Sequence, residues 1–129
     1  MKRINTPEAP AAVGAYSQAT VSDNLVFTAG QIALTTSGKL QNSSIEEETR
    51  QIMANLQAIL KAAGCSFANV VQARIYITER DFFPRVNAVY SEYFSEDETP
   101  ARECVVAAPP LEGAYVEISM IAELSSTEA

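Results

Sequence analysis

The sequence predicts an α+β protein with a mixed six-stranded sheet and two helices on one face of that sheet. Two segments have apolar residues at helical spacing, shorter segments alternate apolar and polar residues, and no regular β-α-β order links them. The length of 129 residues fits one domain, residues 1–129. Two helices cover only one sheet face, so we expect the other face to meet a second copy of the chain.

The N-terminal part is expected to supply three strands. Residues 2–4 suit a short edge strand, and residues 16–21 and 25–32 alternate around the turn signal Asp23-Asn24 as a hairpin. Gly30 inside the second of these strands indicates either a β-bulge or the close approach of a ligand or a second backbone. Its position alone favours the bulge.

A first helix is predicted to begin after Ser44, because Glu47 three residues later completes a capping-box pattern. Gly64 is the expected C-terminal stop. Between them an apolar stripe recurs at helical spacing, formed by Ile45, Ile52, Met53, Leu56, Ile59, Leu60 and Ala63.

The second half is expected to contain one strand over residues 70–78, a helix from Asp81 with Pro84 in its first turn, and a last strand over residues 115–124. Asn87 lies beside the inner stripe of that helix, which comprises Phe82 or Phe83, Val86, Val89, Tyr90, Tyr93 and Phe94. In the strand at 70–78 the predicted apolar face is Val71, Ala73, Ile75 and Ile77.

Between this helix and the last strand, residues 99–106 (TPARECVV) are predicted to form a buried strand that contains an arginine. Alternation places Arg102 and Cys104 on one face and Glu103 on the other. A guanidinium keeps its proton, so an arginine on a covered face needs an anionic partner. That partner is either a carboxylate of the chain, Glu117 or Glu123, or the carboxylate of a ligand, and the pattern leaves both open.

Composition excludes several classes of function. The chain has no histidine, which removes Ser-His-Asp and Cys-His catalysis and most catalytic zinc sites. A net charge of −7 with only 9 Lys and Arg argues against nucleic-acid binding. No apolar run reaches the ~18 residues of a membrane span, and the first ten residues do not read as a signal peptide. Cys65 and Cys104 lack metal or redox spacing and suit a reducing cytoplasm.

Six segments in order resemble the RidA/YjgF family, whose older members carry the label L-PSP endoribonuclease. They are APAAVGAYSQA (9–19), VFTAGQI (26–32), NLQAILKAAG (55–64), VNAVYSEYF (86–94), PAREC (100–104) and VEISMIA (116–122). The resemblance implies a chorismate-mutase-like (YjgF-like) fold and a homotrimer with clefts between subunits. It also implies hydrolysis of 2-imino acids, such as 2-iminopropanoate and 2-iminobutanoate, to 2-keto acids and ammonia, with no cofactor and no metal.

The resemblance also implies roles for individual residues. Arg102 would grip the substrate carboxylate bidentately, a geometry that suits arginine. Glu117 would hold or activate the attacking water, and the Cys104 carbonyl would be a second group that holds this water in place. The remaining cleft positions would be Tyr16, the Gly30 backbone and Asn87. A covalent role for the Cys104 thiol is disfavoured, because no base is available to form a thiolate.

Two features leave other functions open. Pro109-Pro110 replaces an Arg-Leu that is frequent in bacterial members of the family, which bears on the range of substrates. Arg102 is equally compatible with a non-catalytic protein that binds small carboxylates and regulates a partner. A ribonuclease that inhibits translation ranks last, because the chain is acidic and has no histidine.

Overall fold

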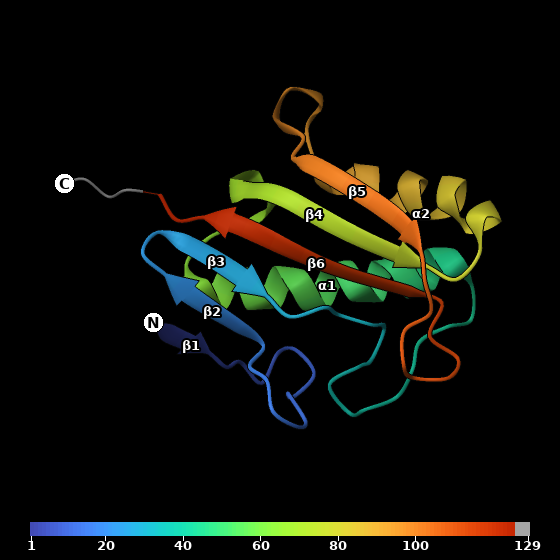
Figure 1. The fold of residues 1–129 in the computed structure, drawn as a ribbon, viewed down its shortest axis with the longest axis horizontal. Coiled ribbons are helices and arrows are strands. Elements are labelled where there is room, and N and C mark those ends of the chain that lie inside the picture. Colours follow the sequence, from blue (N-terminus) through green and yellow to red (C-terminus); the bar gives the residue numbers. More distant parts are fainter. Residues whose placement is uncertain (126–129) are drawn as a thin grey trace.

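The computed structural model describes residues 1–125 and contains one six-stranded mixed sheet, in the order β1-β2-β3-β6-β4-β5 (Figure 1). The pairing is antiparallel between all neighbours except β4 and β5, which run parallel. The strands are β1 (Lys2–Ile4), β2 (Ala19–Ser22), β3 (Leu25–Thr28), β4 (Val70–Ile77), β5 (Ala101–Val106) and β6 (Val116–Glu123).

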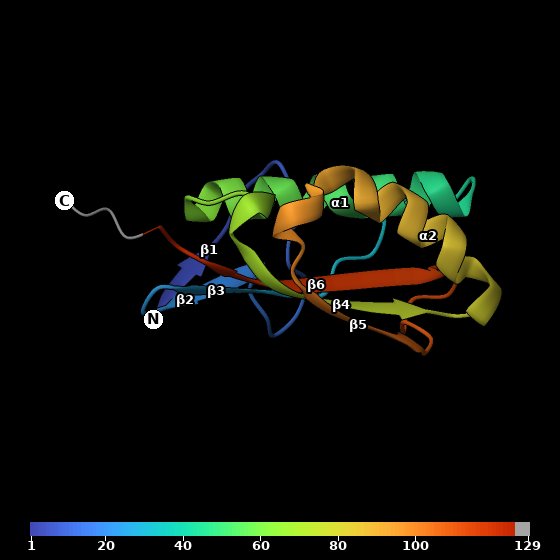
Figure 2. The ribbon, with the colours of Figure 1, turned by 90° about the horizontal axis from the view of Figure 1, so that it is seen from above.

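Two helices, α1 (Ile45–Ala63) and α2 (Phe83–Tyr90), lie on the same face of this sheet (Figure 2). Their presence on one face confirms the predicted architecture. The opposite face carries no helix (Figure 2) in the part of the chain that the structure describes. None of the helices in residues 1–125 is long and apolar enough to cross a membrane.

The ends of α1 are set by local side-chain and backbone chemistry. Ser44 Oγ accepts a hydrogen bond from the Glu47 backbone N–H at 3.0 Å, which satisfies one of the free donors of the first turn. Gly64 ends the helix at φ 94°, a left-handed conformation that glycine adopts at no steric cost. Both predicted helix boundaries are therefore confirmed.

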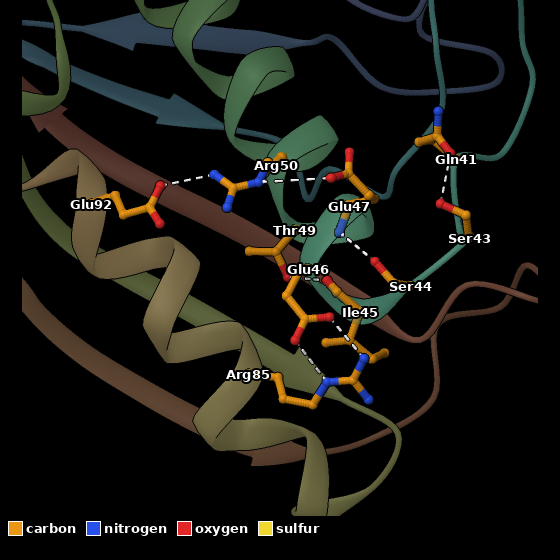
Figure 3. A network of polar contacts seen from close by, with 10 residues as sticks. All are labelled: Gln41, Ser43, Ser44, Ile45, Glu46, Glu47, Thr49, Arg50, Arg85 and Glu92. Atoms are coloured by element: carbon orange, nitrogen blue, oxygen red, sulfur yellow. Dashed lines mark hydrogen bonds and ion pairs between the residues drawn. The ribbon is translucent and has the colours of Figure 1, made fainter.

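Exposed ion pairs connect the two helices (Figure 3). Arg85 of α2 binds both carboxylate oxygens of Glu46 on α1, at 2.7 and 2.9 Å. Arg50 of α1 reaches Glu92, beyond the end of α2, at 2.8 Å. The bidentate Arg85 contact lowers the pKa of Glu46 to about 2. These exposed pairs connect α1 to α2 and to the turn that follows it, and ion pairs of this kind contribute little to stability.

The core lies between the helices and the sheet and follows the predicted stripes, with one exception. Val71 is 44% exposed, although it was predicted to face the core. A register shift in the β4–β6 ladder between Val70 and Gln72 turns Val70 inward instead. From Ala73 onward the predicted alternation is confirmed. Fully buried members of the core include Ile52, Met53, Leu56, Ile59, Leu60, Ile75 and Ile118.

Two predicted strands are shorter than expected, and a third is not buried. The chain leaves the ladder before Ala19 and after Thr28, so residues 16–18 and 29–32 lie outside the named strands. The strand with Arg102 was predicted to be buried. It is the edge strand β5, paired only with β4, and five of its six residues are exposed in the single chain. Its alternating pattern gave no information on its place in the sheet.

A buried carboxylate anchors the start of β6. Glu48 on α1 is 0% exposed. Its Oε2 accepts the backbone N–H groups of Tyr115 and Val116 at 2.7 and 3.0 Å, while Oε1 has no hydrogen-bond partner within residues 1–125. Burial raises the pKa of Glu48, because removal from water penalises the charged form more than the two amides favour it.

This raised pKa predicts a pH-dependent loss of stability. The folded state binds the Glu48 proton more tightly than the unfolded state does, so the free energy of unfolding should fall as pH rises from the ordinary pKa of 4.5 through the raised pKa. Glu48→Gln cannot titrate, and the variant should lack this part of the fall. Urea unfolding of both proteins across this pH range measures the difference. A difference between them that is constant with pH would contradict the assigned shift.

Candidate functional site

Arg102 projects from β5 toward α2, where three side chains surround its guanidinium. Asn87 Oδ1 accepts a hydrogen bond from Nη1 at 2.6 Å. The guanidinium carbon lies 5.3 Å from the Phe83 ring centroid and 5.2 Å from that of Tyr90, within cation–π range. Within residues 1–125 no carboxylate forms an ion pair with Arg102. The cation is therefore held in place and remains free to bind an external anion.

Glu103, the acidic neighbour of Arg102, points to the other face of the sheet. Its carboxylate lies 3.6 Å from Arg74 on the adjacent strand β4. This arrangement confirms the alternation predicted for β5, and it leaves the charge of Arg102 unneutralised by Glu103.

Glu117 lies on the helix-free face of the sheet, since its neighbours Val116 and Ile118 in β6 point into the core. Its carboxyl group sits directly over Gly30. Gly30 lies outside the named strands, and the group that approaches it closely is the side chain of Glu117, not a ligand or a second backbone as the sequence suggested. Burial raises the pKa of Glu117, which favours proton exchange closer to neutral pH than for an exposed glutamate.

The structure excludes an ion pair between Arg102 and Glu117 within one chain, the simplest alternative to a ligand site. Arg102 lies on the α2 side of the sheet and Glu117 on the opposite side. The other proposed partner, Glu123, accepts a hydrogen bond from Asn24 instead. Neither of these two carboxylates contacts Arg102 within residues 1–125, which leaves its guanidinium open to the anion of a ligand.

The predicted site residues fall into two groups, each with its own cavities. Tyr16, Gly30 and Glu117 border a largely apolar cleft of about 430 Å³, and Gly30 and Glu117 also border a second of about 380 Å³. Arg102 borders a cavity of about 550 Å³ with Asn87 and another of about 480 Å³ with Cys104. The cavities at Glu117 do not reach Arg102, and those at Arg102 do not reach Glu117.

The Cys104 side chain is poorly suited to nucleophilic chemistry. Burial raises the pKa of its thiol, and the nearby Arg102 charge opposes this only in part. The thiol therefore remains protonated at neutral pH. Within residues 1–125, no three His, Cys, Asp or Glu side chains come together as metal ligands.

Two buried amides that the sequence did not single out fix the walls of the cleft at Glu117. Gln18 Nε2 donates to the carbonyls of Ala9 and Pro10, at 3.4 and 2.8 Å, and holds the loop that precedes Tyr16. Asn55 on α1 donates to the carbonyls of Ile32 and Leu34, at 3.2 and 2.9 Å. The only signal in the sequence that could have indicated such a residue was a polar side chain next to the apolar stripe of the helix, which is the position of Asn55.

Adding a methyl group at Gly30 should displace the Glu117 carboxylate. A Cβ there would overlap Oε2 and lie 2.9 Å from Cδ of Glu117. Gly30 lacks a positive φ, so alanine meets no backbone strain. For Gly30→Ala we expect any activity that uses Glu117 to fall about 10- to 100-fold, because small misplacements of a reacting group are costly. Steady-state kinetics measure the loss.

The double variant Gly30→Ala/Glu117→Ala tests whether the overlap is the cause. Removing the Glu117 carboxylate leaves room for the new methyl group, so Gly30→Ala should lower the melting temperature less in this background than in the native chain. An equal decrease in both backgrounds would show that Glu117 is not what opposes a side chain at this position.

Comparisons with known proteins show the family and the fold of the chain. The family Endoribonuclease L-PSP matches residues 6–124. The chain is 42% identical to the 2-iminobutanoate/2-iminopropanoate deaminase of Rattus norvegicus over 94% of its length and 88% of that protein. It is 39% identical to the putative regulator AldR of Lactococcus lactis over 98% and 100% of the two chains. The crystal structure of a putative endoribonuclease from Thermotoga maritima superposes with a TM-score of 0.92 at 41% identity, covering 98% and 99% of the chains.

The fold therefore defines a class of small α+β proteins with a YjgF-like mixed sheet and two helices on one face. Within that class, the chain belongs to the RidA/YjgF/L-PSP family. Relatives in this family include named imine deaminases and a named putative regulator.

Proposed function

We propose that this protein hydrolyses reactive 2-imino acids, such as 2-iminopropanoate and 2-iminobutanoate, to the 2-keto acids and ammonia. The observation that carries the proposal is Arg102, a fixed guanidinium without a carboxylate partner in residues 1–125. A planar guanidinium fits a carboxylate through two parallel hydrogen bonds. The named activity of the Rattus norvegicus relative supports the same substrate class.

The proposed chemistry requires neither histidine nor a covalent intermediate. A 2-imino acid is already electrophilic at C2, and water adds there while the C=N double bond becomes a C–N single bond. Glu117, with its raised pKa, accepts a proton from the water and passes it to the nitrogen, which gives a carbinolamine. It then accepts the proton of the new hydroxyl group and passes it to the amine, so that the C–N bond breaks, a C=O bond forms and ammonia leaves. The Cys104 carbonyl is proposed as the second group that holds this water in place.

We further propose that each catalytic cleft forms between two copies of the chain, in a homotrimer. Arg102 and Glu117 lie on opposite faces of one sheet, so one chain alone does not bring them to the same substrate. A head-to-tail contact would place Arg102, Asn87 and Cys104 of one copy opposite Tyr16, Gly30 and Glu117 of the next. Apolar side chains on the helix-free face support such a contact, since Phe27 and Val105 are 39% and 47% exposed in the single chain.

The remaining parts of the proposal concern the domain and its location. Residues 1–129 would act as one domain, which takes a small 2-imino acid as its substrate and needs no nucleic acid or membrane. The half-buried thiols Cys65 and Cys104 fit a reducing cytoplasm, where free cysteines persist.

A coupled assay tests the proposed reaction. A threonine dehydratase generates 2-iminobutanoate continuously, and formation of 2-oxobutanoate is followed with and without this protein. The expected result is faster formation of the keto acid in proportion to the added protein. No acceleration together with measurable binding of 2-oxobutanoate would instead support the second candidate, a non-catalytic regulator, which the name of the Lactococcus lactis relative favours.

A further inference from the structure

We propose that Phe83 and Tyr90 are positioning residues that, with Asn87, clamp the Arg102 guanidinium in the orientation needed to bind a carboxylate. This inference rests on the proposed function for its kinetic consequence, although the clamp itself is a property of the chain. Phe83, Asn87 and Tyr90 follow one another at i, i+4 and i+7, so α2 presents them on one side, above β5.

The clamp explains how an arginine can remain without a carboxylate partner. The negative faces of the Phe83 and Tyr90 rings stabilise the cation, at 5.3 and 5.2 Å from its carbon. Asn87 Oδ1 occupies one N–H of the guanidinium at 2.6 Å. These three groups are neutral, so the full positive charge remains available for a ligand. A carboxylate of the protein in the same place would fix the arginine equally well and would cancel its charge.

The rings also restrict the motion of a long side chain. An exposed arginine loses rotamer entropy when it binds a ligand, and a guanidinium that is already fixed avoids that loss. Tyr90 is 4% exposed and packs on Phe94 at 4.8 Å between centroids, so its own position is firm. Its hydroxyl has no hydrogen-bond partner within residues 1–125, which indicates that the ring is the part that acts.

The variants for the test separate the ring from the hydroxyl and from general packing. Phe83→Leu removes one ring at a half-buried position. Tyr90→Phe keeps the other ring and removes only the unpartnered hydroxyl. Phe82→Leu is the matched control, because Phe82 is also half-buried but packs on Tyr115 at 6.0 Å between centroids. Melting temperatures verify that each variant is folded.

Nuclear magnetic resonance of the Arg102 side chain tests the clamp without reference to activity. The Nε–H order parameter of Arg102 should be high in the native protein and in Tyr90→Phe and Phe82→Leu, and it should fall in Phe83→Leu. An Arg102 Nε–H group that is mobile in the native protein, or one that is unchanged in Phe83→Leu, would overturn the proposal even if the protein hydrolyses imines.

Binding of 2-oxobutanoate, measured by calorimetry, tests the consequence of the clamp for the ligand. Phe83→Leu should weaken binding about 3- to 30-fold, the range expected for a cation–π contact, whereas the control Phe82→Leu should change it less than about 2-fold. In an Arg102→Ala background, Phe83→Leu should have no further effect, because it acts through the arginine. An equal loss in both backgrounds would assign Phe83 a direct or purely structural role and would overturn the proposal.

The two measurements distinguish failure of the clamp from failure of the proposed function. A native protein that neither hydrolyses imines nor binds 2-oxobutanoate would refute the proposed function. The order parameter of Arg102 would then still decide whether α2 fixes the guanidinium.

Discussion

Replacing Arg102 with alanine is expected to lower kcat/KM for 2-iminobutanoate about 30-fold or more, because truncation of one partner in a charged, hydrogen-bonded pair typically costs about 2–5 kcal/mol. The side chain is exposed and lies on an edge strand, so the fold does not depend on it. We expect the free energy of unfolding to change by less than about 1 kcal/mol. Steady-state kinetics and urea unfolding provide the two measurements.

Two further variants show whether the loss is specific to the guanidinium. Arg102→Lys keeps the charge and loses the planar pair of donors, so its activity should lie between those of the native protein and the alanine variant. Arg85→Ala is the matched control, since Arg85 is also exposed but pairs with Glu46 on α1, and its kcat/KM should remain within about 2-fold. Imine hydrolysis by Arg102→Ala at the native rate would rule out a role for Arg102 in substrate binding.

The sequence was sufficient to predict the architecture where local chemistry decides it. The Ser44 cap and the Gly64 stop are properties of short segments, and the structure confirms both. The alternation that separates Arg102 from Glu103 is local in the same way, and it is also confirmed. Helices and strand faces could be read from spacing because a side chain's direction follows from its place in the repeat.

The order of strands in the sheet could not be predicted in this way. Strand β5 has an alternating pattern that suits a covered strand, yet it lies at the edge, because its position depends on pairing with β4 far away in the sequence. The shift at Val70 also arises from a pairing, with β6, and made the prediction for Val71 wrong. Such features depend on long-range contacts, which a period of two residues does not encode.

The surroundings of Arg102 were the part of the site furthest from prediction. The need for an anionic partner was inferred from the cost of burying a charge, but the structure supplies two aromatic rings and an amide oxygen. Phe83 and Tyr90 read as ordinary core residues of an amphipathic helix, since a stripe at helical spacing has the same pattern whether it packs on apolar side chains or on an arginine. The opposite placement of Arg102 and Glu117 then followed only from the topology.

Mixing two inactive variants is expected to restore activity if the cleft lies between copies. Glu117→Gln should abolish the proposed proton transfers, and Arg102→Ala should abolish carboxylate binding. Each variant keeps the side chain that the other has lost, so two different copies together can supply one complete cleft. In a randomly mixed head-to-tail ring, a cleft is intact when Arg102 is contributed by a Glu117→Gln copy and Glu117 is contributed by an Arg102→Ala copy. Each event has a probability of one half, so co-expression should restore about a quarter of the native kcat.

The control for this mixing experiment combines Arg102→Ala with Asn87→Ala, two variants that change the same side of the cleft. Arg102 and Asn87 belong to the same side of the cleft, with Nη1 of Arg102 and Oδ1 of Asn87 2.6 Å apart. In this mixture, whichever copy supplies that side of a cleft lacks one of the two side chains. That mixture should not exceed the average of its two parents. The activity of the Arg102→Ala and Glu117→Gln mixture could also fail to exceed the average of its parents, with light scattering showing mixed oligomers. In that case Arg102 and Glu117 of one cleft could not come from two different copies. A single copy would then have to bring Arg102 and Glu117 together, which requires the sheet that separates them to rearrange.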